Sequence, residues 1–256
     1  MRLMPNLCGP GERKRRLYAN IINSVVLYAS PIWAHIANKK QIKEKMRRIK
    51  RHVALRVISA YRTVSHEASA ILANQIPLDI LANESARIYN AESGLREEGI
   101  ELTPRMRIGI RNMQRSALIQ LWKDILVENS NRLPGGRVRN CLVPILSDWM
   151  ARGKELAMSF RTTQVITGHS CFNVYLYNIR KTGSSVCLHC ERRIDTADHT
   201  LLECDSWTEE RAKQVDAFGL DFTLKKIFEE SLKEPSKWKV FTDYCEQVIR
   251  KKEEAK

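Results

Sequence analysis

Four residues with metal-binding side chains follow one another within eighteen residues of the chain. They are Cys187, Cys190, His199 and Cys204, in the pattern C-x2-C-x8-H-x4-C. Zinc prefers four tetrahedral sulfur and nitrogen ligands, and three thiolates with one imidazole supply that set. One tight turn can present Cys187 and Cys190 together, and one short helix with its end can carry His199 and Cys204. The spacing therefore predicts one structural zinc ion.

Other interpretations of these residue types stay open from the sequence alone. Free cysteines are often buried, so the four residues can also be unrelated members of a hydrophobic core. His189 is an alternative ligand, although it lies inside the tight turn, where its side chain is expected to point away. His169 is an alternative metal ligand or phosphate contact. Because no further ligand set surrounds His169, a hydrogen-bonded structural histidine is the expected role.

Length and composition limit the classes of protein that fit. The 256 residues are enough for one large domain or two small ones. No run of eighteen apolar residues occurs, so no membrane-spanning helix and no membrane partner are expected. The stretch Met1–Pro10 lacks the apolar centre of a signal peptide. Seven cysteines, three of them in the metal motif, indicate a reducing compartment, so an intracellular, non-secreted protein is expected.

The positive charge is concentrated at the beginning of the chain. Residues 1–64 contain fifteen Lys or Arg and only two acids, which accounts for +13 of the net charge of +14. The remaining residues are almost balanced. A single basic segment of this strength indicates a polyanionic partner, most simply nucleic acid.

Two basic helices are expected within this segment. The first spans about residues 12–29, with an apolar stripe formed by Leu17, Ile21, Val25 and Tyr28. Four cations in its first turn oppose the helix dipole, and a bound phosphate would relieve that conflict; the alternative is a solvated charge run. The second spans about residues 39–60, with one apolar face formed by Ile42, Met46, Ile49, Val53 and Val57. The candidate nucleic-acid contacts are Arg13, Lys14, Arg15 and Arg16 on the first helix, and Lys43, Arg47, Lys50 and Arg51 on the second.

The rest of the chain also has helical periodicity, which predicts a mainly α fold. Pro31 is expected to end the first helix, and Ser65 to cap a short helix. Apolar periodicity stops between about residues 93 and 103 and resumes in a long helix from Pro104. That helix is expected to bury Trp122 and a stripe formed by Ile110, Met113, Ala117, Leu121 and Ile125. These changes divide the chain into three parts, residues 1–92, 93–145 and 146–256.

No complete catalytic site can be assigned. Polymerases that use two metal ions need clustered carboxylates, and no pair of adjacent aspartates occurs. Phosphate-binding loops, serine-hydrolase elbows and the acid–lysine pattern of restriction-like nucleases are also missing. The sequence therefore predicts no catalytic residues.

Several separate stretches resemble one family. The stretches 27–34, 51–65, 76–79 and 167–169, followed by the metal motif, resemble the C-terminal third of the polyprotein of non-LTR retrotransposons. The likeness is strongest to type-1 retrotransposable elements that insert into insect ribosomal RNA genes. It covers nearly the whole chain and keeps the order of the parts.

The resemblance implies a fragment of a reverse transcriptase and endonuclease polyprotein. Residues 1–92 would be the thumb-like end of the reverse transcriptase, residues 93–145 a helical connector, and residues 146–256 a helical domain with a CCHC zinc knuckle. Such a parent copies its own RNA into DNA at a nicked genomic target in the nucleus. Its partners would be element RNA, target DNA and the remainder of the polyprotein. Zinc would be structural here, and magnesium is expected only in the missing catalytic domains.

Three functions follow from these observations. The first is nucleic-acid binding by the basic helices and the zinc knuckle during target-primed reverse transcription. The second is a C-terminal nucleic-acid-binding endonuclease region, which needs carboxylates and a lysine that the sequence does not place together. The third is a purely structural zinc domain that packs on the polymerase.

Overall fold

The computed structural model describes residues 9–255 and is built from helices. Residues 1–8, which include most of the stretch Met1–Pro10 considered above, lie outside the described residues. No β-strand is assigned in the described part, where one isolated antiparallel bridge pairs Val186 with Ile194. The prediction of a mainly α fold is therefore confirmed.

The first half of the chain contains six α-helices. They are α1 (Glu12–Val26), α2 (Ser30–Ala37), α3 (Lys40–Val57), α4 (His66–Leu72), α5 (Leu78–Glu97) and α6 (Pro104–Glu128). Ser65 caps α4 by accepting a hydrogen bond from the Ala68 N–H at 3.2 Å, as expected. Pro31 does not simply end the first helix: it occupies the first turn of α2, where a missing N–H has no cost.

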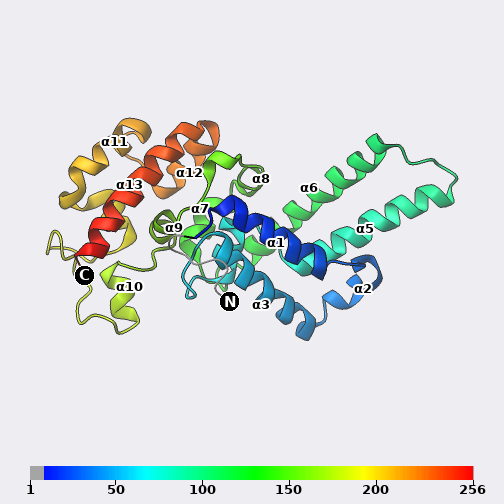
Figure 1. The fold of residues 1–256 in the computed structure, drawn as a ribbon, viewed down its shortest axis with the longest axis horizontal. Coiled ribbons are helices and arrows are strands. Elements are labelled where there is room, and N and C mark those ends of the chain that lie inside the picture. Colours follow the sequence, from blue (N-terminus) through cyan, green and yellow to red (C-terminus); the bar gives the residue numbers. More distant parts are fainter. Residues whose placement is uncertain (1–8, 256) are drawn as a thin grey trace.

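The second half contains shorter helices and the segment with the metal motif. Its elements are α7 (Gly136–Leu142), α8 (Leu146–Met150), η1 (Lys154–Leu156), α9 (Phe160–Thr167), α10 (Asn173–Asn178), η2 (His199–Glu203), η3 (Asp205–Trp207), α11 (Thr208–Phe218), α12 (Leu224–Lys233) and α13 (Pro235–Glu254). Helix α13 crosses this half of the molecule beside α11 and α12 (Figure 1).

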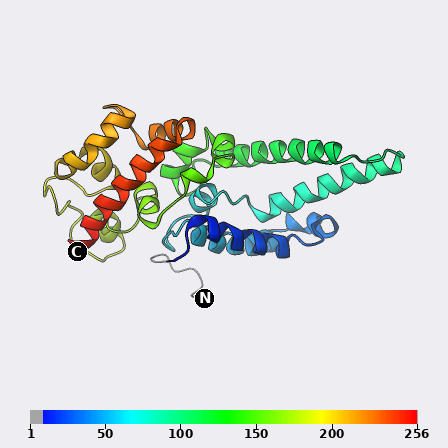
Figure 2. The same cartoon turned by 45° about the horizontal axis from the view of Figure 1, so that its top comes forward.

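Helices α5 and α6 form a long antiparallel hairpin that projects from the rest of the molecule (Figures 1 and 2). The buried residues of α6 are confined to its last part, where they are Leu118, Trp122 and Leu126. Burial of Trp122 confirms the prediction for that residue. The predicted stripe is one position out of register, and Met113 and Leu121 are exposed. The reason is that two helices alone cannot cover both of their apolar sides, so only the base of the hairpin is enclosed.

A continuous hydrophobic core joins the two halves of the chain. Trp149 on α8 donates its indole N–H to the Ile71 carbonyl at 2.9 Å and packs edge-on against Phe228 of α12 at 5.1 Å between ring centroids. Trp238 of α13 lies 6.1 Å from the same tryptophan ring. The proposed divisions of the chain stay predictions: the first falls inside α5, and the second falls at the start of α8.

The apolar stripe of the first helix lies on the surface, contrary to its expected place in a core. Leu17, Ile21, Val25 and Tyr28 are between 53% and 82% exposed. The face of α1 that packs inward contains Ala19, whose small side chain permits close approach, together with Glu12 and Arg15. Helical periodicity identifies an apolar face, but it does not show whether another element covers that face.

None of the described helices combines the length and apolar composition needed to cross a membrane. Six cysteines fall in the described residues, and all six are free.

Candidate metal centre

The turn that carries the first two cysteines is fixed by backbone hydrogen bonds. Cys187 donates its N–H to the Arg193 carbonyl at 2.8 Å, beside the bridge between Val186 and Ile194. Its own carbonyl accepts a hydrogen bond from the Glu191 N–H at 2.9 Å, which closes the turn around Cys190. The two-residue spacing therefore folds into one compact loop that places both sulfurs on the same side.

The other two residues are carried by η2, a single turn of π-helix. The His199 N–H donates to the Thr196 hydroxyl at 2.9 Å, which fixes the start of this turn. The Cys204 N–H then donates to the His199 carbonyl at 2.8 Å. This wide five-residue turn brings Cys204 back beside His199, whereas the sequence alone predicted an ordinary short helix.

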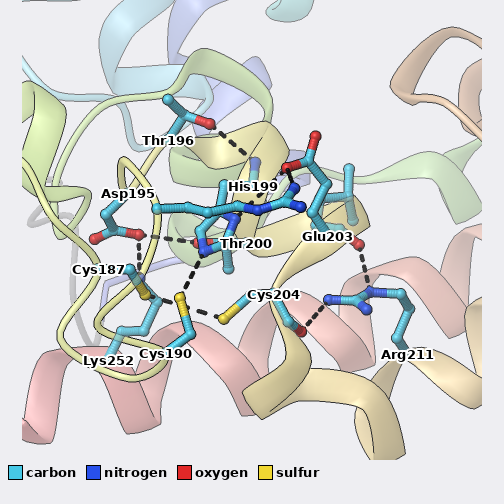
Figure 3. A network of polar contacts seen from close by, with 12 residues as sticks. Cys187, Cys190, Asp195, Thr196, His199, Thr200, Glu203, Cys204, Arg211 and Lys252 are labelled. Carbon is cyan, nitrogen blue, oxygen red and sulfur yellow. Dashed lines mark hydrogen bonds and ion pairs between the residues drawn. The ribbon is translucent and has the colours of Figure 1, made fainter.

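These two segments bring the four predicted ligands together (Figure 3). Their ligand atoms all lie within 4.8 Å of one another, and three of the four residues are buried. The Sγ atoms of Cys187 and Cys204 are 4.0 Å apart, and Cys190 Sγ lies 3.3 Å from His199 Nε2. Around a tetrahedral zinc ion, sulfur–sulfur and sulfur–nitrogen separations are about 3.8 and 3.5 Å, given typical bond lengths. The cluster therefore fits the size and donor set of a zinc site.

The thiols of the cluster differ in their environments. Burial raises the pKa of the Cys190 thiol, but hydrogen bonds from the backbone N–H groups of Arg192 and Arg193 outweigh it and lower that pKa to about 6. Burial raises the pKa of the Cys204 thiol to about 11. Cys190 is therefore ready to bind metal as a thiolate, while Cys204 needs the charge of a metal ion to lose its proton.

A buried ion pair lies beside the cluster and links it to the last helix. Lys252 of α13 donates to Asp195 Oδ1 at 2.6 Å, and both side chains are 1% exposed. The same carboxylate accepts hydrogen bonds from the Asn173 N–H at 2.9 Å and from the Thr200 hydroxyl at 3.2 Å. Asp195 thus joins the cysteine loop, η2 and the last helix (Figure 3). Through the Asn173 N–H it also binds the start of α10.

The far side of η2 is held by an arginine. Arg211 of α11 donates to the carbonyls of Leu201 at 3.1 Å and Cys204 at 2.5 Å. These supporting residues were not found from the sequence, because the two residues of the Asp195–Lys252 pair are 57 positions apart. The one sequence feature that could have indicated the pair is Lys252, a charged residue at an inward-facing position of the last helix.

The two histidines considered as alternative ligands do not belong to the cluster. His189 packs its ring against Trp207, with 4.6 Å between ring centroids, so it points away from the sulfurs as expected. His169 has its Nδ1 2.8 Å from the Thr167 carbonyl, and its ring lies 5.0 Å from that of Tyr175. Burial lowers the pKa of His169, against the effect of its backbone hydrogen bonds.

Comparison with known proteins finds relatives that cover most of the chain. A putative 115 kDa protein in the type-1 retrotransposable element R1DM of Drosophila melanogaster is 24% identical over 243 residues, which are 92% of this chain and 23% of that protein. A retrovirus-related Pol polyprotein from the element R1 4 of Nasonia vitripennis is 26% identical over 78% of this chain and 50% of its own length. One from the element R1 of Bradysia coprophila is 23% identical over 82% of this chain and 21% of its own length.

The chain is related to the Pol polyproteins of R1 type-1 retrotransposable elements. It spans between about a fifth and a half of the length of these relatives. No protein-family profile and no solved structure matches it.

The cations predicted to contact nucleic acid in this R1-related chain differ in their exposure and in their partners. Arg15 is 2% exposed and donates to the Pro10 and Arg56 carbonyls, and Lys50 is 1% exposed and donates to Asn23. These two residues therefore do not lie on an open basic surface, contrary to the prediction from the helical pattern.

Four more of these cations are held by partners within the chain. Arg16 pairs with Glu12, Lys43 with Asp79 at 3.2 Å, Arg47 with Glu67 at 3.0 Å, and Arg51 donates to the Arg62 and Val64 carbonyls at 2.6 and 2.9 Å. Arg13 and Lys14 are exposed, and among the described residues their side chains have no ion-pair partner. Except for the i,i+4 pair of Arg16 with Glu12, the sequence could not distinguish these cases, because the other partners lie outside the helix that carries the cation.

Proposed function

We propose that this chain is part of an R1-type Pol polyprotein and that it binds nucleic acid through a zinc-stabilised module. The observation that carries the proposal is the cluster of three sulfurs and one imidazole, all within 4.8 Å of one another, in a chain related to R1 Pol polyproteins over most of its length. Zinc would be held by Cys187, Cys190, His199 and Cys204. Its role would be to fix the two loops, since structural zinc contributes folding free energy directly.

The surface beside the cluster has the composition of a single-strand binding surface. The cysteine loop exposes Leu188 and Ile194, each more than half accessible, and the exposed cations Arg192 and Arg193 lie between them in the sequence. Arg192 and Arg193 make only exposed ion pairs, which contribute little to stability. Their charge is therefore available for phosphate groups.

A shallow groove lies next to this loop, at the end of α10. It is lined by residues 177–178 and 180–183, including Tyr177, Arg180 and Lys181. Tyr177 is 51% exposed. Exposed aromatic rings stack on bases while neighbouring cations contact the backbone, and this combination is typical of proteins that bind single strands. We infer that an RNA or DNA strand crosses this groove and the cysteine loop.

In this proposal the N-terminal helices would make a second contact with the nucleic acid. Arg13 and Lys14 at the start of α1 take the place of the larger basic surface expected from the sequence, and residues 1–92 would correspond to the thumb-like end of the polymerase. Element RNA, genomic target DNA and the rest of the polyprotein would be the partners, in the nucleus. The chemistry of DNA synthesis, with its magnesium ions, would belong to other parts of the polyprotein.

A purely structural zinc domain is the second candidate. The burial of three of the four ligands and the Asp195–Lys252 pair favour it, because they make the cluster part of the core. The endonuclease alternative has no comparable observation in its favour, since the described residues gather no carboxylate-rich site.

The deciding experiment measures zinc content and nucleic-acid binding on the whole chain. We expect one zinc per chain, and loss of zinc in Cys204→Ala. Binding of single-stranded RNA and DNA should fall steeply with salt, because each phosphate contact releases counterions. The double variant Arg180→Gln/Lys181→Gln should reduce the salt slope by about 1.4, which corresponds to two lost contacts on a single strand.

The matched control is Lys225→Gln/Lys239→Gln, which removes two exposed cations from α12 and α13. It should leave the slope unchanged. A fully zinc-loaded protein that binds no strand, or equal slopes for the two double variants, would leave only the structural candidate. Arg13→Gln/Lys14→Gln tests the second contact by the same measurement.

A further inference from the structure

A cavity of about 640 Å³ lies near the basic helices, at the base of the α5–α6 hairpin. Its walls come from α1, α3, α5, α6 and α8, together with the loop between α4 and α5. Figure 1 shows these elements meeting where the hairpin leaves the body. A volume of this size is within the range of sites that take small molecules such as nucleotides.

A buried lysine lines this cavity without a counter-charge. Lys50 is 1% exposed, and its ammonium donates to Asn23 Oδ1 at 2.9 Å. No carboxylate of the described residues lies within ion-pair distance of it. Buried charges are normally paired, because removing an ion from water is costly. Burial and, to a lesser extent, the charge of Arg115 lower the pKa of Lys50 to about 7.

The other charged groups of the cavity do not supply the missing anion. Arg16 and Arg115 both line the cavity, and each is already paired, with Glu12 and Glu84 respectively. Glu12 also pairs with the buried Arg152 at 3.4 Å, so its single negative charge is shared by two guanidinium groups. No carboxylate is therefore left over to compensate the charge of Lys50.

Neutral hydrogen-bonding groups complete the lining. Asn20 and Gln75 face the cavity, and the Gln75 side-chain oxygen accepts a hydrogen bond from Asn23 at 3.4 Å. An ammonium, two guanidinium groups and amide N–H groups around one space match the several oxygens of a phosphate better than the two of a carboxylate.

We propose that this cavity binds a phosphate group, with the Lys50 ammonium as its central contact and the amides of Asn20 and Gln75 as further donors. The ligand is a nucleotide or the phosphorylated end of a nucleic-acid strand, since both present the same group and the cavity has room for a nucleotide. The site is separate from the metal centre, and the inference does not rest on the proposed function.

The test is calorimetric titration of the whole chain below pH 7 with pyrophosphate, a nucleoside triphosphate, and a trinucleotide with or without a 5′-phosphate. Wild-type protein should bind pyrophosphate, and Lys50→Met should weaken binding at least tenfold. Lys45→Met is the matched control on the same helix, because Lys45 is exposed and should leave binding unchanged. A preference for the triphosphate or for the 5′-phosphorylated trinucleotide identifies the source of the group.

The design separates loss of binding from loss of folding. Lys50→Met removes an unpaired buried charge, so this variant should unfold at a temperature equal to or above that of the wild type in phosphate-free buffer. Phosphate should then raise the unfolding temperature of the wild type and not that of Lys50→Met. No binding by wild-type protein, or equal affinity in Lys50→Met, would overturn the proposal. Binding of long strands without terminal phosphate reports the surface described above and is independent of this outcome.

Discussion

Replacing Lys252 by Met should destabilise the protein strongly, although it lies in the last turns of the C-terminal helix. The substitution keeps the length of the apolar stem and removes the ammonium that donates to Asp195 at 2.6 Å. Both side chains are 1% exposed, so water cannot replace the lost partner. Asp195 would keep its hydrogen bonds from Asn173 and Thr200, but its negative charge would be buried without a counter-ion.

Removing one partner of a buried ion pair typically costs about 3–5 kcal/mol. Two retained hydrogen bonds to the carboxylate place the expected loss for Lys252→Met near the lower figure, about 3 kcal/mol. For a chain of this size that loss corresponds to a decrease of about 6–12 °C in the unfolding temperature. Because Asp195 also supports η2, zinc affinity should fall by about tenfold or more.

The assay is urea unfolding of zinc-loaded protein, with zinc affinity measured by competition with a chelator. The adjacent Lys251→Met is the control, because Lys251 is half exposed and its pair with Glu210 should contribute less than about 1 kcal/mol. The double variant Asp195→Asn/Lys252→Met should recover part of the loss, since it leaves no unpaired charge. Equal stabilities for Lys251→Met and Lys252→Met would refute this account of the pair.

Three further experiments test the fold and its electrostatics. Gly135→Ala should cost at least about 2 kcal/mol in urea unfolding, because Gly135 has φ +82° and its new Cβ would meet the Ser65 hydroxyl; normal stability would contradict this. Val25→Ser should change the free energy of unfolding by less than about 0.5 kcal/mol, whereas Val53→Ser in the core should cost about 2–3 kcal/mol, and equal effects would contradict the observed burial. The lowered pKa of Lys50 means that its charged form is unfavourable in the folded state. The free energy of unfolding of Lys50→Met should therefore exceed that of the wild type most below pH 7, and the difference should disappear as the pH rises toward 10.5. A difference that does not depend on pH would exclude the buried charge as its cause.

The metal cluster was predictable from the sequence, because its spacing constrains geometry locally. A two-residue gap between Cys187 and Cys190 allows few turns, and a five-residue step from His199 to Cys204 fits one turn of helix. The π-helical form of that turn was not predictable, since it depends on how Arg211 and Tyr244 hold its carbonyls; Tyr244 donates to the Thr200 carbonyl at 2.7 Å.

The positions of the cations were the least predictable feature. Both basic helices were expected, and their bounds differ from the expected ones by a few residues. Arg15 and Lys50 fall on polar positions of those helices, yet their partners Arg56 and Asn23 are 41 and 27 residues away. A helical pattern records which residue types share a face. It contains no information on long-range acceptors, so it overestimated the exposed positive surface.

The α5–α6 hairpin has a mechanical consequence for the cavity at its base. Helix α6 has 25 residues, so at about 1.5 Å per residue it is a rigid arm of about 37 Å. Burial is confined to one end of this arm, where Leu118, Trp122 and Leu126 act as the fulcrum. From Trp122 to the far end at Pro104 the arm is about 27 Å long, so a rotation of about 10° at the fulcrum displaces the tip by about 5 Å. Because Arg115 and Ile119 line the cavity beside that fulcrum, a change of one ångström around Lys50 is geometrically magnified severalfold at the tip.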